Sequence, residues 1–140
     1  MLTRRKVIAV VDDDSSTLDA IGLLLDAHGF ESRIFDSAEA FLERDVAESV
    51  DCLLLDIHLG GLSGIDLRRR LEASGSTLPV IFMTALDDAA TRGQALSAGC
   101  VAYLQKPVHA RQLMDAILKA SPWQSSSRLV TAFCCHRGRA

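Results

Sequence analysis

The sequence "KVIAVVDDDSST", residues 6–17, joins five apolar residues to three consecutive carboxylates. The run Val7–Val11 is apolar at every position, which is typical of a strand that is covered on both faces of a parallel sheet. Asp12, Asp13 and Asp14 follow at once, and like charges this close together repel one another at neutral pH. The stretch therefore predicts a buried strand whose carboxyl end carries negative charge that another group must neutralise.

Four more runs along the chain read as strands, namely "ESRIF" (31–35), "VDCLLL" (50–55), "LPVIFM" (78–83) and "VAYLQ" (101–105). Each strand is followed by a segment with helical spacing. Alternating strands and helices predict βαβ units, hence a doubly wound α/β fold with a five-stranded parallel sheet and helices on both faces. The first expected helix begins at a cap on Ser15 or Ser16, and the second begins at Ser37. The other three span 64–74, 87–97 and 109–120.

Composition predicts one domain and restricts its surroundings. We expect the domain to span 4–120, followed by a Ser-rich linker and short basic tail over 121–140. All 18 acidic residues precede Ser121, which argues against nucleic-acid binding by this segment itself. The apolar run near the N-terminus is too short for a signal peptide, and no other run approaches membrane-spanning length. A cytoplasmic location without membrane contact is therefore expected.

Ionic and hydroxyl side chains follow four of the predicted strands, where each strand ends. The carboxyl ends of parallel strands meet at one edge of a sheet, where ligands bind. Carboxylates gathered there need a cation, and an all-oxygen set with open positions suits Mg²⁺. No His, Cys or Ser nucleophile with a base in register accompanies them, which argues against acyl transfer by a triad. The converging residues are Asp12 and Asp13, Asp56, Thr84 and Lys106.

These residue types point to phosphoryl chemistry. A carboxylate beside Mg²⁺ and a lysine can attack phosphorus and hold the phosphoryl group as an acyl phosphate. A small-molecule Mg²⁺ phosphatase remains an alternative at this point. In another alternative, Asp12, Asp13 and Asp14 are only helix-cap and loop charges. This interpretation accounts for Asp14 but poorly for three aspartates together after a buried strand.

Four motifs occur in order over residues 4–120, namely "VVDDD", "LLLDIHLGGLSG", "FMTA" and "YLQKP". In this combination the sequence resembles the receiver domain of two-component response regulators, in the CheY-like superfamily. The resemblance implies a flavodoxin-like sheet with strand order 2-1-3-4-5.

The resemblance also implies roles for the acidic residues. Asp56 corresponds to the phosphoacceptor aspartate. Asp12 and Asp13 correspond to the acidic pair that holds Mg²⁺ together with Asp56, and the main-chain carbonyl of His58 corresponds to the remaining protein ligand.

Further roles concern the switch. Thr84 corresponds to the hydroxyl that turns toward the phosphoryl group, and Tyr103 to the aromatic residue that changes rotamer as Thr84 moves. Lys106 corresponds to the lysine that pairs with the phosphoryl group, and the Lys106–Pro107 bond is usually cis in the family. Thr84 and Tyr103 would thus have two arrangements, and the charge of the phosphoryl group would favour one of them, which is how a molecular switch works.

The loop after Asp56 departs from the family pattern. Leu59 and Gly60 stand where Met-Pro is common, so the loop lacks a stiffening proline and we expect it to be more mobile. We expect the His58 side chain to lie on the rim of the site.

The resemblance implies a signalling switch, not an enzyme. Its expected partner is a histidine kinase or a histidine phosphotransfer protein, with self-association through the fourth helix, fifth strand and fifth helix. A docking module that works without phosphorylation is an alternative. An aspartyl-phosphate phosphatase is less favoured, because that class places a second acid two residues after the acceptor. The sequence names neither the kinase nor the output, nor whether the natural protein continues beyond Ala140.

Overall fold

The computed structural model describes residues 5–44 and 46–120, in which five parallel strands form one sheet of order β2-β1-β3-β4-β5. The predicted α/β class and strand order are confirmed. The Ser-rich linker and basic tail predicted over 121–140 lie outside the described residues, as does Arg4 at the start of the predicted domain. The strands are β1 (Val7–Val11), β2 (Glu31–Phe35), β3 (Cys52–Asp56), β4 (Val80–Thr84) and β5 (Ala102–Gln105).

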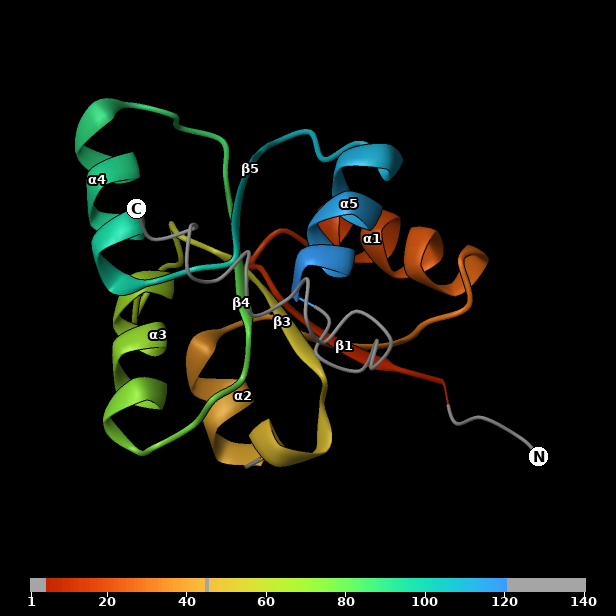
Figure 1. Cartoon of the computed structure of the whole chain (residues 1–140), viewed down its shortest axis with the longest axis horizontal. Coiled ribbons are helices and arrows are strands. Elements are labelled where there is room, and N and C mark those ends of the chain that lie inside the picture. The colour runs from red at the N-terminus through yellow and green to blue at the C-terminus, as the bar shows by residue number, and fades with distance from the viewer. Residues whose placement is uncertain (1–4, 45, 121–140) are drawn as a thin grey trace, which may run out of the picture.

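Helices cover both faces of the sheet, as right-handed crossovers require (Figure 1). Two of them, α1 and α5, lie on one face, and α2, α3 and α4 lie on the other. Within the described part of the chain, no helix has the length and apolar character to span a bilayer. The helices are α1 (Ser15–Ala27), α2 (Ala38–Arg44), α3 (Gly64–Ala73), α4 (Ala89–Ala98) and α5 (Ala110–Ala120), with a 3₁₀ turn η1 (Ala47–Ser49) before β3.

Strand β1 shows why the apolar runs are continuous. Successive side chains of a strand point to opposite faces. Val7, Ala9 and Val11 pack in the core with α2, α3 and α4. Ile8 and Val10 pack in the second core, with α1 and α5. All residues of β1, β3 and β4 are buried in this way, whereas the edge strands β2 and β5 are partly exposed.

The start of α1 corrects one prediction. Asp14 is the N-cap, not Ser15 or Ser16: its Oδ1 accepts a hydrogen bond from the Ser16 amide at 3.1 Å, and its Oδ2 accepts one from the Thr17 hydroxyl at 3.0 Å. A carboxylate at this position also interacts favourably with the positive end of the helix dipole. The third aspartate of the run therefore belongs to the helix, which leaves the other two for the sheet edge.

Whereas α1 starts earlier than predicted, α4 starts later. Asp88 is its N-cap, with Oδ1 accepting a hydrogen bond from the Thr91 amide at 2.7 Å. Asp87, predicted as the first helical residue, instead lies in the loop between β4 and α4.

Gly64 allows α3 to begin directly against the end of β3. Its amide donates to the Ile57 carbonyl at 3.0 Å. A Cβ atom at this position would lie 2.2 Å from the Asp56 carbonyl oxygen and 3.0 Å from the Ile57 Cα. Both obstructing groups are main chain, so a larger residue would displace either the helix or the strand end that carries Asp56.

We predict that Gly64→Ala lowers the free energy of unfolding by at least about 2 kcal/mol, because the backbone cannot yield as a side chain does. Urea unfolding measures the change. Gly93→Ala in α4 is the control: its Cβ would meet nothing within 4 Å, so it should be neutral or stabilising by up to about 1 kcal/mol. A Gly64→Ala protein as stable as the wild type would contradict the close approach.

Candidate functional site

The carboxyl edge of the sheet brings together Asp12, Asp56 and Lys106. Lys106 Nζ lies 2.6 Å from Asp12 Oδ2 and 3.3 Å from Asp56 Oδ2. The exposed fraction of the side chains is 0% for Asp12, 6% for Asp56 and 17% for Lys106. The bond from Lys106 to Pro107 is cis. Two buried carboxylates thus share one ammonium, and the group keeps an excess negative charge.

Asp13 completes an acidic cluster that fits a small divalent cation. Carboxylate oxygens of Asp12, Asp13 and Asp56 lie within 4.8 Å of one another, with Asp13 exposed at the surface. Asp12 Oδ1 accepts a hydrogen bond from the Asp14 amide, but Oδ2 has no hydrogen bond of good geometry and only the close Lys106 ammonium. Oxygen ligands of one Mg²⁺ lie roughly 3–4 Å apart, so this cluster needs little movement to hold such an ion.

The surroundings of Asp56 disfavour its charged form. Burial, with the neighbouring Asp12 carboxylate, raises the pKa of Asp56 to about 6; Lys106 and the His58 amide, which donates to Oδ1 at 3.2 Å, oppose the shift. Burial acts against the Lys106 ammonium too, but its contacts with the two carboxylates outweigh this, and its pKa is raised. A bound cation would relieve the repulsion and favour the ionised acceptor at neutral pH.

The loop between β3 and α3 lies along the acidic cluster. The His58 side chain is exposed, as predicted for a rim residue. Leu59 and Leu62 pack against the core on the α2, α3 and α4 face. A Cβ at Gly60 would lie 3.8 Å from Asp13 Oδ2, so the loop backbone passes close to that carboxylate.

Thr84 ends β4 at the same edge, but its hydroxyl is engaged by its own loop. It is fully buried, donates to the Leu86 carbonyl at 3.0 Å and accepts from the Leu86 amide at 3.0 Å. The hydroxyl would have to leave Leu86 to reach a group bound on Asp56.

Tyr103 on β5 is held by two residues that the sequence analysis did not single out. Its hydroxyl donates to Asp87 Oδ1 at 3.1 Å, and the Arg92 guanidinium lies 4.7 Å from the centre of its ring. Arg92 also donates to both Asp87 oxygens, at 2.9 and 2.8 Å. We call these three residues the tyrosine clamp. It links β5 to α4 and to the loop that begins at Thr84.

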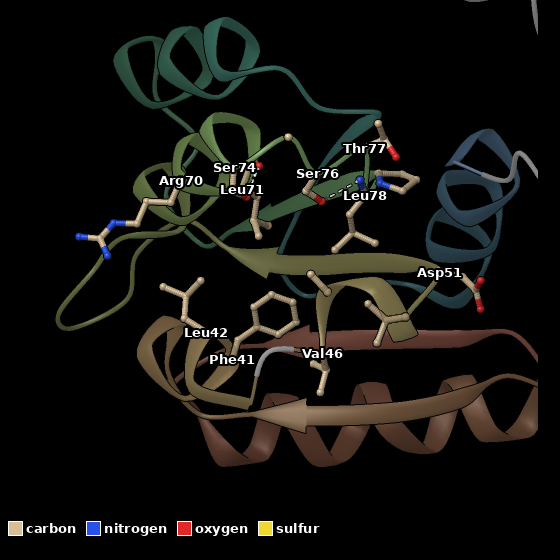
Figure 2. Close-up of a pocket in the computed structure, with 14 residues that line it drawn as sticks. Phe41, Leu42, Val46, Asp51, Arg70, Leu71, Ser74, Ser76, Thr77 and Leu78 are labelled. Carbon is tan, nitrogen blue, oxygen red and sulfur yellow. Dashed lines mark hydrogen bonds between the residues drawn. The ribbon is translucent and has the colours of Figure 1, made fainter.

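A hollow of about 930 Å³ lies at the amino ends of the strands, beside the starts of β3 and β4 (Figure 2). Its apolar walls include Phe41 and Leu78, and the Arg70 side chain extends away from it. Asp51 at its end accepts a hydrogen bond from the Val7 amide at 2.8 Å. Among the described residues that line it, only Asp51 and Arg70 are ionic, and Figure 2 shows them at opposite ends of the hollow, so the acidic edge is the candidate site.

Sequence reasoning did not single out three side chains that contact the loops around this site, namely Glu39, Asp87 and Arg92. Glu39 on α2 accepts a hydrogen bond from the Leu62 amide in the β3–α3 loop at 2.9 Å. Each of the three contacts a segment distant in the sequence, and no local motif marks them.

Comparison with known proteins agrees with this geometry. The family model of the response regulator receiver domain matches residues 8–118. The transcriptional regulatory protein TdiR of Thauera aromatica is 36% identical over 110 residues, covering 79% of this chain and 48% of that protein. The transcriptional regulatory protein FixJ of Bradyrhizobium diazoefficiens is 35% identical over 125 residues, covering 86% and 61%. The chain thus spans about half to three-fifths of the length of these relatives.

Solved structures show the same fold. The crystal structure of FixJ-N superposes with a TM-score of 0.77 at 28% identity, over 86% of this chain and 97% of that one. The structure of the response regulator StyR gives a TM-score of 0.78 at 33% identity, over 97% and 69%.

The raised pKa of Asp56 predicts a dependence of stability on pH. The pKa of this carboxyl rises from 3.8 to about 6 on folding, so the folded state binds the proton more tightly than the unfolded state does. The folded state therefore loses stability as pH increases through that range. At pH 7.5 without divalent ions, the ionised Asp56 should disfavour the folded state by on the order of 2–3 kcal/mol. Asp56→Asn should therefore be more stable than the wild type there, and the difference should shrink toward pH 4 or with added Mg²⁺.

Urea unfolding in EDTA at pH 7.5 and pH 4.5 measures the effect, with the exposed Asp115→Asn as control. An Asp56→Asn protein that is less stable than the wild type at pH 7.5 in EDTA would contradict the prediction.

Proposed function

The chain belongs to the response regulator receiver domain family, and from this premise we propose that it is a phosphorylation-controlled switch with Asp56 as the phosphoacceptor. The observation that carries the proposal is the buried contact of Lys106 with both Asp12 and Asp56. We propose residues 4–120 as the receiver domain, which includes the whole match to the family.

The proposed reaction is a phosphoryl transfer from a phosphohistidine. An Asp56 carboxylate oxygen attacks phosphorus, a P–O bond forms, and the P–N bond to the donor imidazole breaks with its electron pair leaving on nitrogen. The product is an acyl phosphate, and the protein's part is to hold the acceptor in place and compensate charge. The donor is a sensor histidine kinase or a histidine phosphotransfer protein.

The residues around Asp56 have complementary tasks. Asp12, Asp13, Asp56 and the His58 main-chain carbonyl would hold Mg²⁺, which when bound neutralises charge on the transferring phosphoryl group. Lys106, already in contact with the acceptor, pairs with a phosphoryl oxygen as a point charge. Burial of the site limits the access of water to the acyl phosphate.

Switching begins at Thr84. When its hydroxyl donates to a phosphoryl oxygen, its two hydrogen bonds with Leu86 are lost and the loop to α4 moves. That loop carries Asp87, so the tyrosine clamp opens and Tyr103 changes its position. The altered face of α4, β5 and α5 then changes its affinity for partners.

We also propose that this face mediates self-association. Leu96 on α4 and Leu118 on α5 are 61% and 53% exposed, and we propose them as part of a homodimer contact. The names of TdiR and FixJ, both transcriptional regulatory proteins, support control of transcription as the output. We propose a cytoplasmic location and no direct nucleic-acid contact by residues 4–120.

The test is the mass of the protein after incubation with Mg²⁺ and acetyl phosphate. We expect a gain of one phosphoryl group in the wild type and none in Asp56→Asn or in EDTA. Asp115→Asn, which keeps the acidic cluster, should react as the wild type does. A phosphoryl group that persists in Asp56→Asn would contradict the assignment of the acceptor.

The same experiment separates the alternatives. Absence of any gain in the wild type would favour a docking module that works without phosphorylation. Continuous release of inorganic phosphate from a phosphorylated substrate would favour a phosphatase.

Opening the tyrosine clamp should also ease phosphorylation. Asp87→Ala removes the acceptor of the Tyr103 hydrogen bond, which the switched state must lose in any case. Loss of this hydrogen bond should destabilise the unswitched state by about 1 kcal/mol, and the rate of phosphorylation by acetyl phosphate should rise about fivefold. Stopped-flow or timed mass spectrometry measures this rate, with Asp115→Ala as control; an unchanged or lower rate in Asp87→Ala would argue against the clamp.

A further inference from the structure

We propose that Glu39, on α2, is a positioning residue for the divalent-cation site and acts through the loop of residues 58–63. The inference deepens the proposed function, because it concerns the cation that phosphorylation of Asp56 requires. It is drawn from three contacts of this loop.

The first contact joins α2 to the loop. Glu39 Oε2 accepts a hydrogen bond from the Leu62 amide at 2.9 Å, across 23 residues of sequence. This hydrogen bond is the main reason that the pKa of Glu39 is lowered, so the carboxylate is ionised at neutral pH. The bond is thus charge-assisted, and such bonds are stronger than those between neutral groups.

The second contact lies between the Glu39 carboxylate and the backbone at Gly61. A Cβ at Gly61 would lie 2.7 Å from Glu39 Oε2 and 3.3 Å from Oε1, so the carboxylate packs directly on the loop backbone. Gly61 does not have a positive φ, and its own conformation therefore does not demand glycine. Glu39 and Gly61 form a matched pair in which the missing side chain makes room for the carboxylate.

The third contact is at the other end of the loop. The His58 amide donates to Asp56 Oδ1 at 3.2 Å, and Gly60 passes close to Asp13. The segment that Glu39 restrains thus touches two of the three clustered carboxylates and includes the proposed His58 carbonyl ligand.

The composition of the loop makes an external restraint useful. Gly60 and Gly61 stand in succession, and glycine loses more backbone freedom on ordering than any other residue. A fixed hydrogen bond from α2 lowers the freedom that cation binding has to remove, and groups behind metal ligands typically influence metal affinity in this way. Glu39 thus restrains, from a helix, a loop that contains two successive glycines.

The test compares Glu39→Ala with Glu43→Ala in the full chain. Glu43 is an exposed acid one turn further along α2, so it controls for the lost charge and the helix substitution. We expect Glu39→Ala to raise the Kd for Mg²⁺ about tenfold in isothermal titration calorimetry, and to speed hydrogen exchange at the Leu62 amide. Glu43→Ala should change neither. Glu39→Gln keeps an acceptor oxygen and should lie between the wild type and Glu39→Ala.

A double-mutant cycle tests the pairing with Gly61. Gly61→Ala should displace the Glu39 carboxylate and weaken Mg²⁺ binding as much as Glu39→Ala does. In the Glu39→Ala background the same substitution should add little, because the obstructing carboxylate is gone. Equal losses in both backgrounds would show that Gly61 acts independently of Glu39 and would overturn the pairing.

The outcomes separate this inference from the proposed function. If the wild type binds Mg²⁺ and gains a phosphoryl group, but Glu39→Ala matches Glu43→Ala in Kd, Glu39 has no positioning role. A lower melting temperature of Glu39→Ala with an unchanged Kd would show a merely structural role and also overturn it. A wild type that neither binds Mg²⁺ nor gains a phosphoryl group would overturn both proposals.

Discussion

The contact of one ammonium, that of Lys106, with two buried carboxylates is the constraint around which this molecule is organised. Burying a charge is costly unless a partner compensates it, and here two acids share a single base. Among the described residues, Lys106 is the one cationic side chain that forms an ion pair with Asp12 or Asp56, so one negative charge stays unpaired. The site therefore keeps a net negative charge, which is compatible with a bound Mg²⁺ and with the phosphoryl transfer that we propose.

The sheet keeps these charges in place. Val11 is paired with Leu55 and Asp56 with Met83, so the ends of neighbouring strands are held in register. The central strands are buried on both faces and present polar groups only where they end. Movement is left to the loops that follow them, among which the loop after Thr84 and the loop after Asp56 differ in how they are restrained. The loop after Thr84 is held by the hydrogen bonds between Thr84 and Leu86, and the loop after Asp56 is held by one from Glu39 on α2.

The sequence was sufficient for the architecture and for the charged centre. Continuous apolar runs predicted the two-sided burial, and the rule that strand ends converge brought Asp12, Asp56 and Lys106 together across the length of the chain. The cap of α1 was placed one or two residues late, on Ser15 or Ser16, because Asp and Ser are both good caps and their order in the sequence does not rank them. The interpretation of Asp14 as a helix-cap charge was correct. The contacts of Glu39, Asp87 and Arg92 could not be predicted, since long side chains find partners only once helices and loops are packed.

The order of the site residues along the chain has a consequence for biosynthesis. Asp12 and Asp56 are synthesised well before Lys106, and a nascent chain that still lacks β5 has two acids at the sheet edge without their common base. Nor does such a chain have Tyr103, the proposed switch residue, which lies on that last strand. Under the proposed function, the last strand and the residue that follows it therefore supply together the base that pairs with the acceptor and the proposed switch residue.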